Sequence, residues 1–533
     1  MRKFAIAVSA AVLLSSGAVW ASGMFRHGHG HSSISLELAG SFQNGVFGTA
    51  AAEISAFDPK SKRLFVVNAD EDKVDVVDMS DPANMTRVLQ IAPDGSPNSV
   101  AIHKGLVAVA VEASVKTDPG AVEFYDIDGT LLKRLTVGAL PDMLTFTQDG
   151  KAVLVANEGE PNDAYTIDPE GSISIIDLSR GLNRASVKTA GFGDFNGKKD
   201  KLIKAGVRIF GPNATVAQDL EPEYIAVDRD SRTAWVSLQE ANAFAVVDIR
   251  RGKVTDILPL GYKDHSRSRN ALDASDREGA INITTWPIFG MYMPDAIAAY
   301  EVKGKTYVVS ANEGDSRDYD GFAEEARVKD LTLDPAAFPD AATLQLDPNI
   351  GRLTVTTANG DENKDGTFEK LFAFGGRSFS IWSESGRLVY DSGDDFERIT
   401  ADALPAEFNS DNEENDTFDN RSDNKGPEPE GLALGEIDDR IYAFIGLERI
   451  GGVMVFDITD PRRPRFVEYV NNRDFAGDPE AGTAGDLGPE GLIFISAKDS
   501  PTRKPLLVVA NEISGTTSVY TINRERDHKT AHR

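Results

Sequence analysis

The 533-residue sequence contains no cysteine. This absence excludes disulfide bonds, thiolate metal sites and cysteine nucleophiles. Histidine is scarce as well, and only His103 and His265 lie outside the two ends of the chain. We therefore expect neither a histidine-rich metal centre nor a Ser-His-Asp catalytic triad.

Long runs of lysine and arginine are also missing. Acidic residues number 84 against 56 basic ones, for a formal charge of −28. A chain this negative repels phosphate backbones and anionic lipid surfaces. We expect no nucleic-acid partner; divalent cations, or substrates carried by cations, suit this charge better.

The sequence lacks an apolar run long enough to cross a bilayer comfortably. Its longest candidate, Phe4–Leu14, follows Arg2 and Lys3 and precedes Val19-Trp20-Ala21. This order is typical of an export signal with a small-residue cleavage site. We predict a signal peptide over residues 1–21 and an exported protein, periplasmic or secreted, with no transmembrane segment; a retained anchor helix is the alternative.

Strand signals are abundant. Hydrophobic residues make up 41% of the chain, enough for a sizeable core. Short apolar or β-branched runs bounded by Gly, Asp, Asn and Pro, such as 64–67, 153–155 and 506–509, predict strands, and no long helical period interrupts them. The expected class is all-β.

A repeat underlies these strands. Each unit has a polar residue before its first strand, and these residues are Glu53, Asn98, Asp142, Glu223, Asp295, Glu430 and Glu490. A second set ends the second strand of each unit, and it comprises Asp70, Glu112, Glu158, Glu240, Glu313, Glu448 and Glu512. Seven copies of a four-strand unit predict a seven-bladed β-propeller. Two β-sandwiches, the alternative, do not explain a sevenfold recurrence.

The predicted propeller is a single domain over residues 35–522. Its last unit runs out of chain after three strands, so we expect Ser35–Phe42 to supply the fourth strand and close the ring. Closure removes the exposed edge of the sheet and favours a monomer. Residues 22–34 are predicted to be a His/Gly-rich flexible tail, and residues 523–533 a polar C-terminal tail.

The extra residues between repeats are not scattered. They follow either the second or the fourth strand of a unit, at 159–171, 264–294, 315–375, 397–429 and 473–489. In an up-and-down blade both connections emerge on the same face. Long loops on one face of a rigid scaffold indicate where function is located.

The recurrent acids are expected on that face, around the mouth of the channel. Crowded carboxylates raise one another's pKa or require a compensating cation, and oxygen ligands suit Ca²⁺ or Mg²⁺. Ca²⁺ is the expected cofactor, with another divalent metal as the alternative. The candidate ligands are Glu158, Glu160, Glu313, Asp315, Glu428, Glu430 and Glu490. Alternatively, each acid accepts hydrogen bonds from backbone N–H groups or pairs with an arginine.

Asp361, Asn363 and Asp365, followed by Gly366, match the first half of a calcium loop. The twelfth position is Phe372, so the usual bidentate glutamate is missing. The segment is either a calcium site in a propeller loop or a polar turn.

One segment, Ser310–Tyr319, combines a hydroxyl, an arginine and several acids. Ser316 as a nucleophile beside a metal, with Arg317 binding a phosphoryl group, is one hypothesis. In the other, Arg317 pairs with nearby acids and holds the loop. Arg377, after Gly375-Gly376, is a second candidate for an anion contact.

Several longer motifs resemble those of the choice-of-anchor I family. They are Asn157-Glu158-Gly159-Glu160-Pro161, the run from Ala311 to Tyr319, Phe374 to Trp382, and Gly426-Pro427-Glu428-Pro429-Glu430-Gly431. The resemblance extends from about Leu36 to Ile522. The family includes mesenchyme-specific cell-surface glycoproteins and bacterial proteins described as atypical alkaline phosphatases. The resemblance implies an exported propeller linked to calcium, biomineralisation and phosphate release.

Two functions follow from these patterns. The first is a metal-dependent phosphoester hydrolase, alkaline phosphatase-like, acting on phosphomonoesters or phosphodiesters. The second is a non-catalytic calcium-binding propeller that holds a ligand or partner at its mouth.

Overall fold

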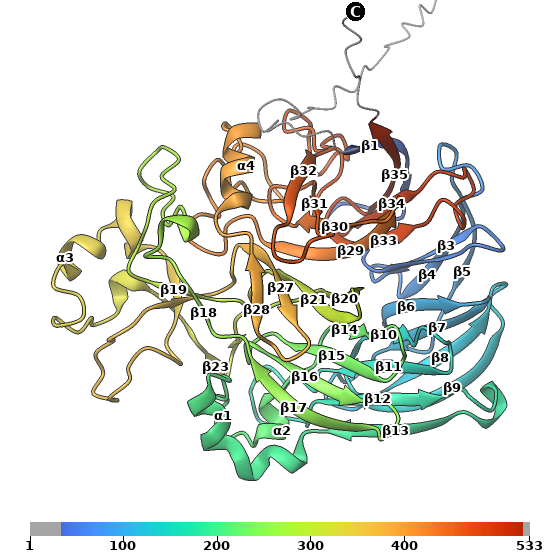
Figure 1. Cartoon of the computed structure of the whole chain (residues 1–533), viewed down its shortest axis with the longest axis horizontal. Coiled ribbons are helices and arrows are strands. Elements are labelled where there is room, and N and C mark those ends of the chain that lie inside the picture. Colours follow the sequence, from blue (N-terminus) through green and yellow to red (C-terminus); the bar gives the residue numbers. More distant parts are fainter. Residues whose placement is uncertain (1–32, 526–533) are drawn as a thin grey trace, which may run out of the picture.

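The computed structural model describes residues 33–525, which form consecutive four-stranded antiparallel sheets (Figure 1). The first three sheets contain β2 (Ser55–Asp58), β3 (Arg63–Asn68), β4 (Lys73–Asp78) and β5 (Thr86–Ile91); β6 (Pro97–His103), β7 (Leu106–Val111), β8 (Pro119–Asp126) and β9 (Leu131–Ala139); and β10 (Pro141–Phe146), β11 (Ala152–Asn157), β12 (Ser172–Asp177) and β13 (Ser186–Gly191). The next three contain β14 (Ile225–Val227), β15 (Thr233–Leu238), β16 (Ala243–Asp248) and β17 (Lys253–Pro259); β20 (Ile297–Val302), β21 (Lys305–Asn312), β27 (Ser378–Ser383) and β28 (Leu388–Asp391); and β29 (Pro429–Ile437), β30 (Arg440–Leu447), β31 (Val453–Asp457) and β32 (Arg465–Val470).

One further sheet unites the two ends of the described chain. It contains β33 (Pro489–Ile495), β34 (Leu506–Asn511), β35 (Thr516–Glu525) and β1 (Ser33–Gln43). β1 pairs antiparallel with β35, and Leu36 lies opposite Ile522. The strand expected over residues 35–42 therefore lies in β1, and it occupies the outer position of the last sheet.

Burial along the strands follows their order in each sheet. Second strands such as β11 and β34 are buried along their whole length, because neighbouring sheets cover both faces. Fourth strands such as β5 and β13 are mostly exposed. First strands contact one another in a circle, in the order β2, β6, β10, β14, β20, β29, β33 and back to β2. The chain is thus an all-β propeller with its first strands around the centre, as the repeat predicts.

Two insertions form a unit of their own beside the propeller (Figure 1). The segments after β17 and β21 contribute to a five-stranded sheet of β18 (Tyr262–Asp264), β19 (Phe289–Met291), β26 (Phe372–Ala373), β25 (Thr354–Thr356) and β24 (Glu325–Arg327). Leu272, Val328 and Leu353 belong to its separate apolar core. The sequence predicts loops here; the structure instead shows a small packed layer, because the insertions bring enough apolar residues to bury one another.

Helices are few and short among the described residues. They are η1 (Leu182–Arg184), η2 (Gly193–Lys198), α1 (Lys199–Ala205), α2 (Val216–Asp219), η3 (Ser268–Asn270), η4 (Val328–Asp330), α3 (Ala341–Leu344), η5 (Asp347–Gly351) and α4 (Asp395–Ala403); two short strands, β22 (Asp318–Tyr319) and β23 (Phe322–Ala323), form a hairpin. The segment with η2, α1 and α2 lies between β13 and β14, outside the five insertions expected from the repeat. No described helix has the length and apolar character that a bilayer crossing requires.

Leu36 and Leu38 test the contribution of β1 to stability. The Leu36 side chain is buried in the core shared with β33–β35, whereas Leu38 on the same strand is 41% exposed. We expect Leu36→Ala to lower the free energy of unfolding by about 2–5 kcal/mol and Leu38→Ala to change it by about 0.5 kcal/mol or less. Urea denaturation of both variants measures the difference. Equal effects would show that β1 does not pack as described.

Candidate cation site at the centre of the propeller

The polar residue before each first strand is positioned by a recurrent local structure. Pro97, Pro141, Pro429 and Pro489 each begin their strand, where the missing N–H costs no ladder hydrogen bond. Directly after each proline the first strand carries one more residue than its partner strand. Such a β-bulge redirects the side chain at that point.

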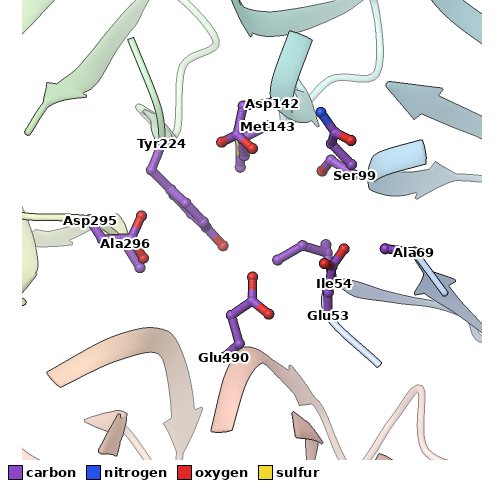
Figure 2. A pocket seen from close by; sticks show the side chains of 11 residues that line it. Glu53, Ile54, Ala69, Ser99, Asp142, Met143, Tyr224, Asp295, Ala296 and Glu490 are labelled. Carbon is purple, nitrogen blue, oxygen red and sulfur yellow. The ribbon is translucent and has the colours of Figure 1, made fainter. Parts of the chain in front are cut away.

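A cavity of about 170 Å³ lies where these strand starts converge (Figure 2). Its polar lining comes from separate sheets and includes Glu53, Asn98, Asp142, Asp295 and Glu490. Figure 2 shows the Tyr224 side chain reaching across the cavity, with its hydroxyl toward Glu490. We call Glu53, Asp142, Glu223, Asp295, Glu430 and Glu490 the inner carboxylates.

Several inner carboxylates have oxygen atoms without a donor. Glu223 Oε2, Glu430 Oε2 and Glu490 Oε2 are buried and have no hydrogen-bond partner among the described residues. A buried carboxylate oxygen without a partner costs free energy, unless the group is protonated or a cation binds. These atoms are therefore the strongest sign of a ligand at the centre.

Carboxylate oxygens approach one another closely in three groups. Within each group one oxygen per residue lies within 4.8 Å of the others, and the groups are Glu53, Glu490 and Glu512; Asp295, Glu313 and Glu430; and Glu313, Glu428 and Glu448. Each group joins acids that are far apart in the sequence. Such oxygen clusters suit Ca²⁺, which takes six to eight oxygen ligands.

The pKa values of the inner carboxylates reflect this crowding. Burial, with further contributions from Glu512 and Asp142, raises the pKa of Glu53 to about 8. Burial and the charge of Glu160 raise the pKa of Asp142 to about 7. For Glu490, burial and the neighbouring carboxylates raise the pKa well above the usual range. At neutral pH these groups are stable in the folded chain either protonated or beside a cation.

Protein cations lie close to some carboxylates of this region. Lys425 Nζ lies 2.8 Å from Glu313 Oε1 and 3.1 Å from Glu428 Oε2, and Arg449 Nε lies 3.0 Å from the same Glu428 oxygen. Burial would raise the pKa of Glu428, but Lys425, Arg421 and Arg449 bring it well below the usual range. Glu428 is thus already neutralised, in contrast to Glu430 two residues later.

The other predicted ligands near the mouth divide into two kinds. Glu158 lies beside Asp142, and its pKa is raised well above the usual range by burial and by neighbouring carboxylates. Glu160 pairs with Lys116 at 2.9 Å and accepts a hydrogen bond from the Tyr319 hydroxyl at 3.0 Å. Asp315 is exposed, and Lys425 is 4.0 Å away. Glu158, which is crowded by other carboxylates, is therefore a better candidate cation ligand than Glu160 or Asp315, each of which has a lysine nearby.

The predicted calcium loop lies outside this centre, in the insertion after β21. Its Asp361 and Asp365 carboxylates come within 4.8 Å of that of Glu369. Asn363 donates a hydrogen bond to Glu369 at 2.5 Å. Glu369 occupies the ninth loop position, whereas the calcium-loop pattern has its bidentate glutamate at the twelfth. Asp361, Asn363 and Asp365 also accept hydrogen bonds from backbone N–H groups within the loop, so both the calcium site and the polar turn stay predictions.

Arg317 and Arg377 are buried rather than open to solvent. The Arg317 guanidinium pairs with Asp219 and, at 2.9 Å, with Glu221, and it stacks on the Phe210 ring. Arg377 pairs with Glu397 at 2.6 Å and donates hydrogen bonds to backbone carbonyls on two insertions. Both guanidinium groups are fully engaged, which favours the hypothesis that Arg317 holds its loop.

Ser316 is not adjacent to the inner carboxylates. Its hydroxyl donates a hydrogen bond of 2.7 Å to Glu325. The structure therefore brings Glu313, Glu428, Glu430 and Glu490 together at the mouth, while Ser316, Arg317 and Arg377 lie in supporting contacts around it.

Several residues of these clusters are not among the ligands that the sequence predicts. They are Glu53, Asp295, Glu448 and Glu512, together with Tyr224 and Lys425. The four acids belong to the two recurrent sets, so their recurrence in the repeat could have identified them as candidate ligands. Nothing in the local sequence marks Tyr224, because its place depends on the position of the opposite sheet.

Arg317→Ala separates the two hypotheses for this residue. Removing one partner of a buried ion pair leaves Asp219 and Glu221 uncompensated, so we expect a loss of about 3–5 kcal/mol in the free energy of unfolding. Arg251→Ala, which removes a surface pair with Asp248, should cost about 1 kcal/mol or less. A stable Arg317→Ala protein would instead agree with a phosphate-binding role. Urea denaturation of both variants distinguishes these outcomes.

The chain is similar in sequence to two animal proteins. Gigasin-3a of Magallana gigas is 33% identical over 189 residues, covering 33% of this chain and 66% of the relative. The mesenchyme-specific cell surface glycoprotein of Strongylocentrotus purpuratus is 30% identical over 282 residues, covering 46% of this chain and 36% of the relative. The matches thus span less than two thirds of either relative.

The solved structures that the chain resembles are distant from it in sequence. Hydrazine synthase of Kuenenia stuttgartiensis matches at 14% identity and a TM-score of 0.45, covering 91% of this chain and 97% of that one. A streptogramin B lyase structure matches at 10% identity and the same TM-score, covering 92% and 98%. Residues 53–461, more than three quarters of the chain, match the choice-of-anchor I domain. The chain therefore belongs to the choice-of-anchor I domain family.

Proposed function

We propose that this chain is an exported protein that binds divalent cations, Ca²⁺ first among them, through the inner carboxylates of its propeller. One observation carries the proposal: Glu223, Glu430 and Glu490 each keep a buried carboxylate oxygen that has no hydrogen-bond partner among residues 33–525. Glu430 and Glu490 belong to two separate groups of close carboxylates, and a cation bound at either group would balance the charge there.

The chemistry of the donors supports a hard cation. Every candidate ligand at the centre offers a carboxylate oxygen, and the chain has no cysteine. Ca²⁺ accepts many oxygen ligands in irregular geometry, whereas Mg²⁺ demands a near-ideal octahedron and keeps most of its water. Carboxylates contributed by several sheets match the first preference better.

Export is supported by two lines of argument. The signal-peptide pattern over residues 1–21 lies outside the described residues and stays a prediction from the sequence. The name of the sea-urchin relative assigns that protein to the cell surface. Outside the cell, free Ca²⁺ is abundant enough for sites with dissociation constants of about 10⁻⁴–10⁻³ M to be filled.

Recognition of a ligand or partner, rather than catalysis, is the role we favour. The guanidinium groups of Arg317 and Arg377 are engaged by buried carboxylates and backbone carbonyls. A phosphoester hydrolase remains the second candidate. It is supported by Lys425 and Arg449, whose partly exposed side chains place positive charge beside the carboxylates of the mouth.

Calcium addition tests the cation site directly. We expect saturating Ca²⁺ to raise the melting temperature of the EGTA-treated chain, because a ligand at 100 times its dissociation constant adds about 2.7 kcal/mol of stability. Glu430→Gln should reduce this increase. Glu436→Gln on the same strand is the matched control, because Glu436 is exposed and outside the clusters. An equal increase in all three proteins would contradict the proposal.

The pH dependence of the metal-free chain provides a second test. The folded-state pKa of Glu53 is raised from 4.5 to about 8, so the protonated carboxyl stabilises the fold fully below about pH 4.5. That contribution is lost as the pH rises through 8, at up to about 1.4 kcal/mol per pH unit. In EGTA we therefore expect stability to fall between pH 5.5 and 8, less steeply in Glu53→Gln.

The measurement is urea denaturation at several pH values, with and without Ca²⁺. Because Ca²⁺ binds the ionised carboxylates, its stabilising effect should grow over the same pH range. Metal-free stability that rises toward pH 8 would show that the inner carboxylates are compensated in some other way.

A further inference from the structure

A second cluster of acids lies away from the inner carboxylates, where two insertions meet. Asp273 and Glu278 belong to the segment between η3 and β19, and Asp419 to the segment between α4 and β29. One carboxylate oxygen of each lies within 4.8 Å of the others. Asp273 and Asp419 are almost fully buried, with exposed fractions of 0% and 2%.

Oxygen atoms in this cluster lack donors. Glu278 Oε1, Asp419 Oδ2 and the side-chain oxygen of Asn409 are buried without a hydrogen-bond partner in the described chain. Asn409 is fully buried and joins the cluster through Ser422, whose hydroxyl donates to Asp419 and accepts from Asn409 Nδ2 at 2.9 Å. Glu278 and Asp419 thus each contribute a buried oxygen without a donor to one cluster of carboxylates, and a bound cation would coordinate such oxygens.

The arginines near this cluster form ion pairs with other acids. Arg377 pairs with Glu397 at 2.6 Å, and Arg352 pairs with Asp276 and, at 2.7 Å, with Asp423. Burial and neighbouring carboxylates accordingly raise the pKa of Asp273 to about 9. The negative charge of the cluster is left for a ligand to balance.

We propose that Asp273, Glu278 and Asp419 form a Ca²⁺ site that joins the two insertions. Carboxylate oxygens are the hard donors that Ca²⁺ selects. Glu278 is only partly buried, so it provides the side from which an ion can reach the site.

The proposed site would connect the same two insertions that Arg377 already connects. Arg377 donates hydrogen bonds to the backbone oxygens of Asp273 and Asn424, and Glu397 accepts one from the Asp273 backbone N–H at 2.9 Å. Bound Ca²⁺ would add a second link between these insertions. The linked segment continues directly to Lys425 and Glu428 at the propeller mouth. The proposal itself does not depend on the inner carboxylates binding a cation.

The test counts Ca²⁺ bound to the EGTA-stripped full chain by equilibrium dialysis. We expect Asp419→Asn and Glu278→Gln each to bind one Ca²⁺ fewer than the parent, or to bind that ion at least tenfold more weakly. Asp416→Asn, an exposed acid in the same segment, is the matched control and should bind as the parent does. Glu278→Gln keeps the test valid if the buried Asp419 substitution prevents folding.

Hydrogen exchange separates this site from the mouth. Ca²⁺ should slow amide exchange in residues 264–294 and 397–424 of the parent and of Glu430→Gln, but not of Asp419→Asn or Glu278→Gln. An unchanged Ca²⁺ count in both site variants would overturn the inference. So would the absence of Ca²⁺-dependent protection in the parent, even if the mouth binds calcium.

Discussion

The mutual repulsion of buried carboxylates at the propeller centre is the constraint on which the rest of the structure depends. The first strands converge in a circle, and each starts with a polar residue, so the fold itself collects like charges. Such crowding is unfavourable in a low-dielectric interior unless protons or cations offset it. The neighbouring loops bring a lysine and arginines that offset part of that charge.

The compensation of these carboxylate charges differs from one repeat to another. On one side Lys425, Arg421 and Arg449 surround Glu428 and hold its carboxylate ionised. Glu223, Glu430 and Glu490, by contrast, each keep a buried carboxylate oxygen without a hydrogen-bond partner among residues 33–525. A uniform architectural role would give every repeat the same compensation. This asymmetry is our reason for proposing a cation site rather than a structural motif of the repeat.

The repeat allowed much of this to be predicted. Short strands separated by turns and a recurrent acid before each first strand indicated the propeller and the gathering of acids at its centre. The pattern did not reveal which acids come within ligand distance, since Asp70 is exposed while the equivalent Glu512 joins a cluster. It also did not reveal that Arg317, placed in a loop rich in acids, would be buried against Asp219 and Glu221 almost a hundred residues earlier.

The sequence by itself determined the strands, the order of the repeats and the position of a polar residue at the start of each, because these depend on local hydrophobic pattern and turn chemistry. Only the tertiary structure decided which acids are left without partners. Pairing depends on side chains brought in by other segments, as Lys425 reaches Glu313 and Arg377 reaches Glu397 and the insertion that holds Asp273. The energy of a buried charge is set by everything that surrounds it, and that surrounding is assembled from residues hundreds of positions apart.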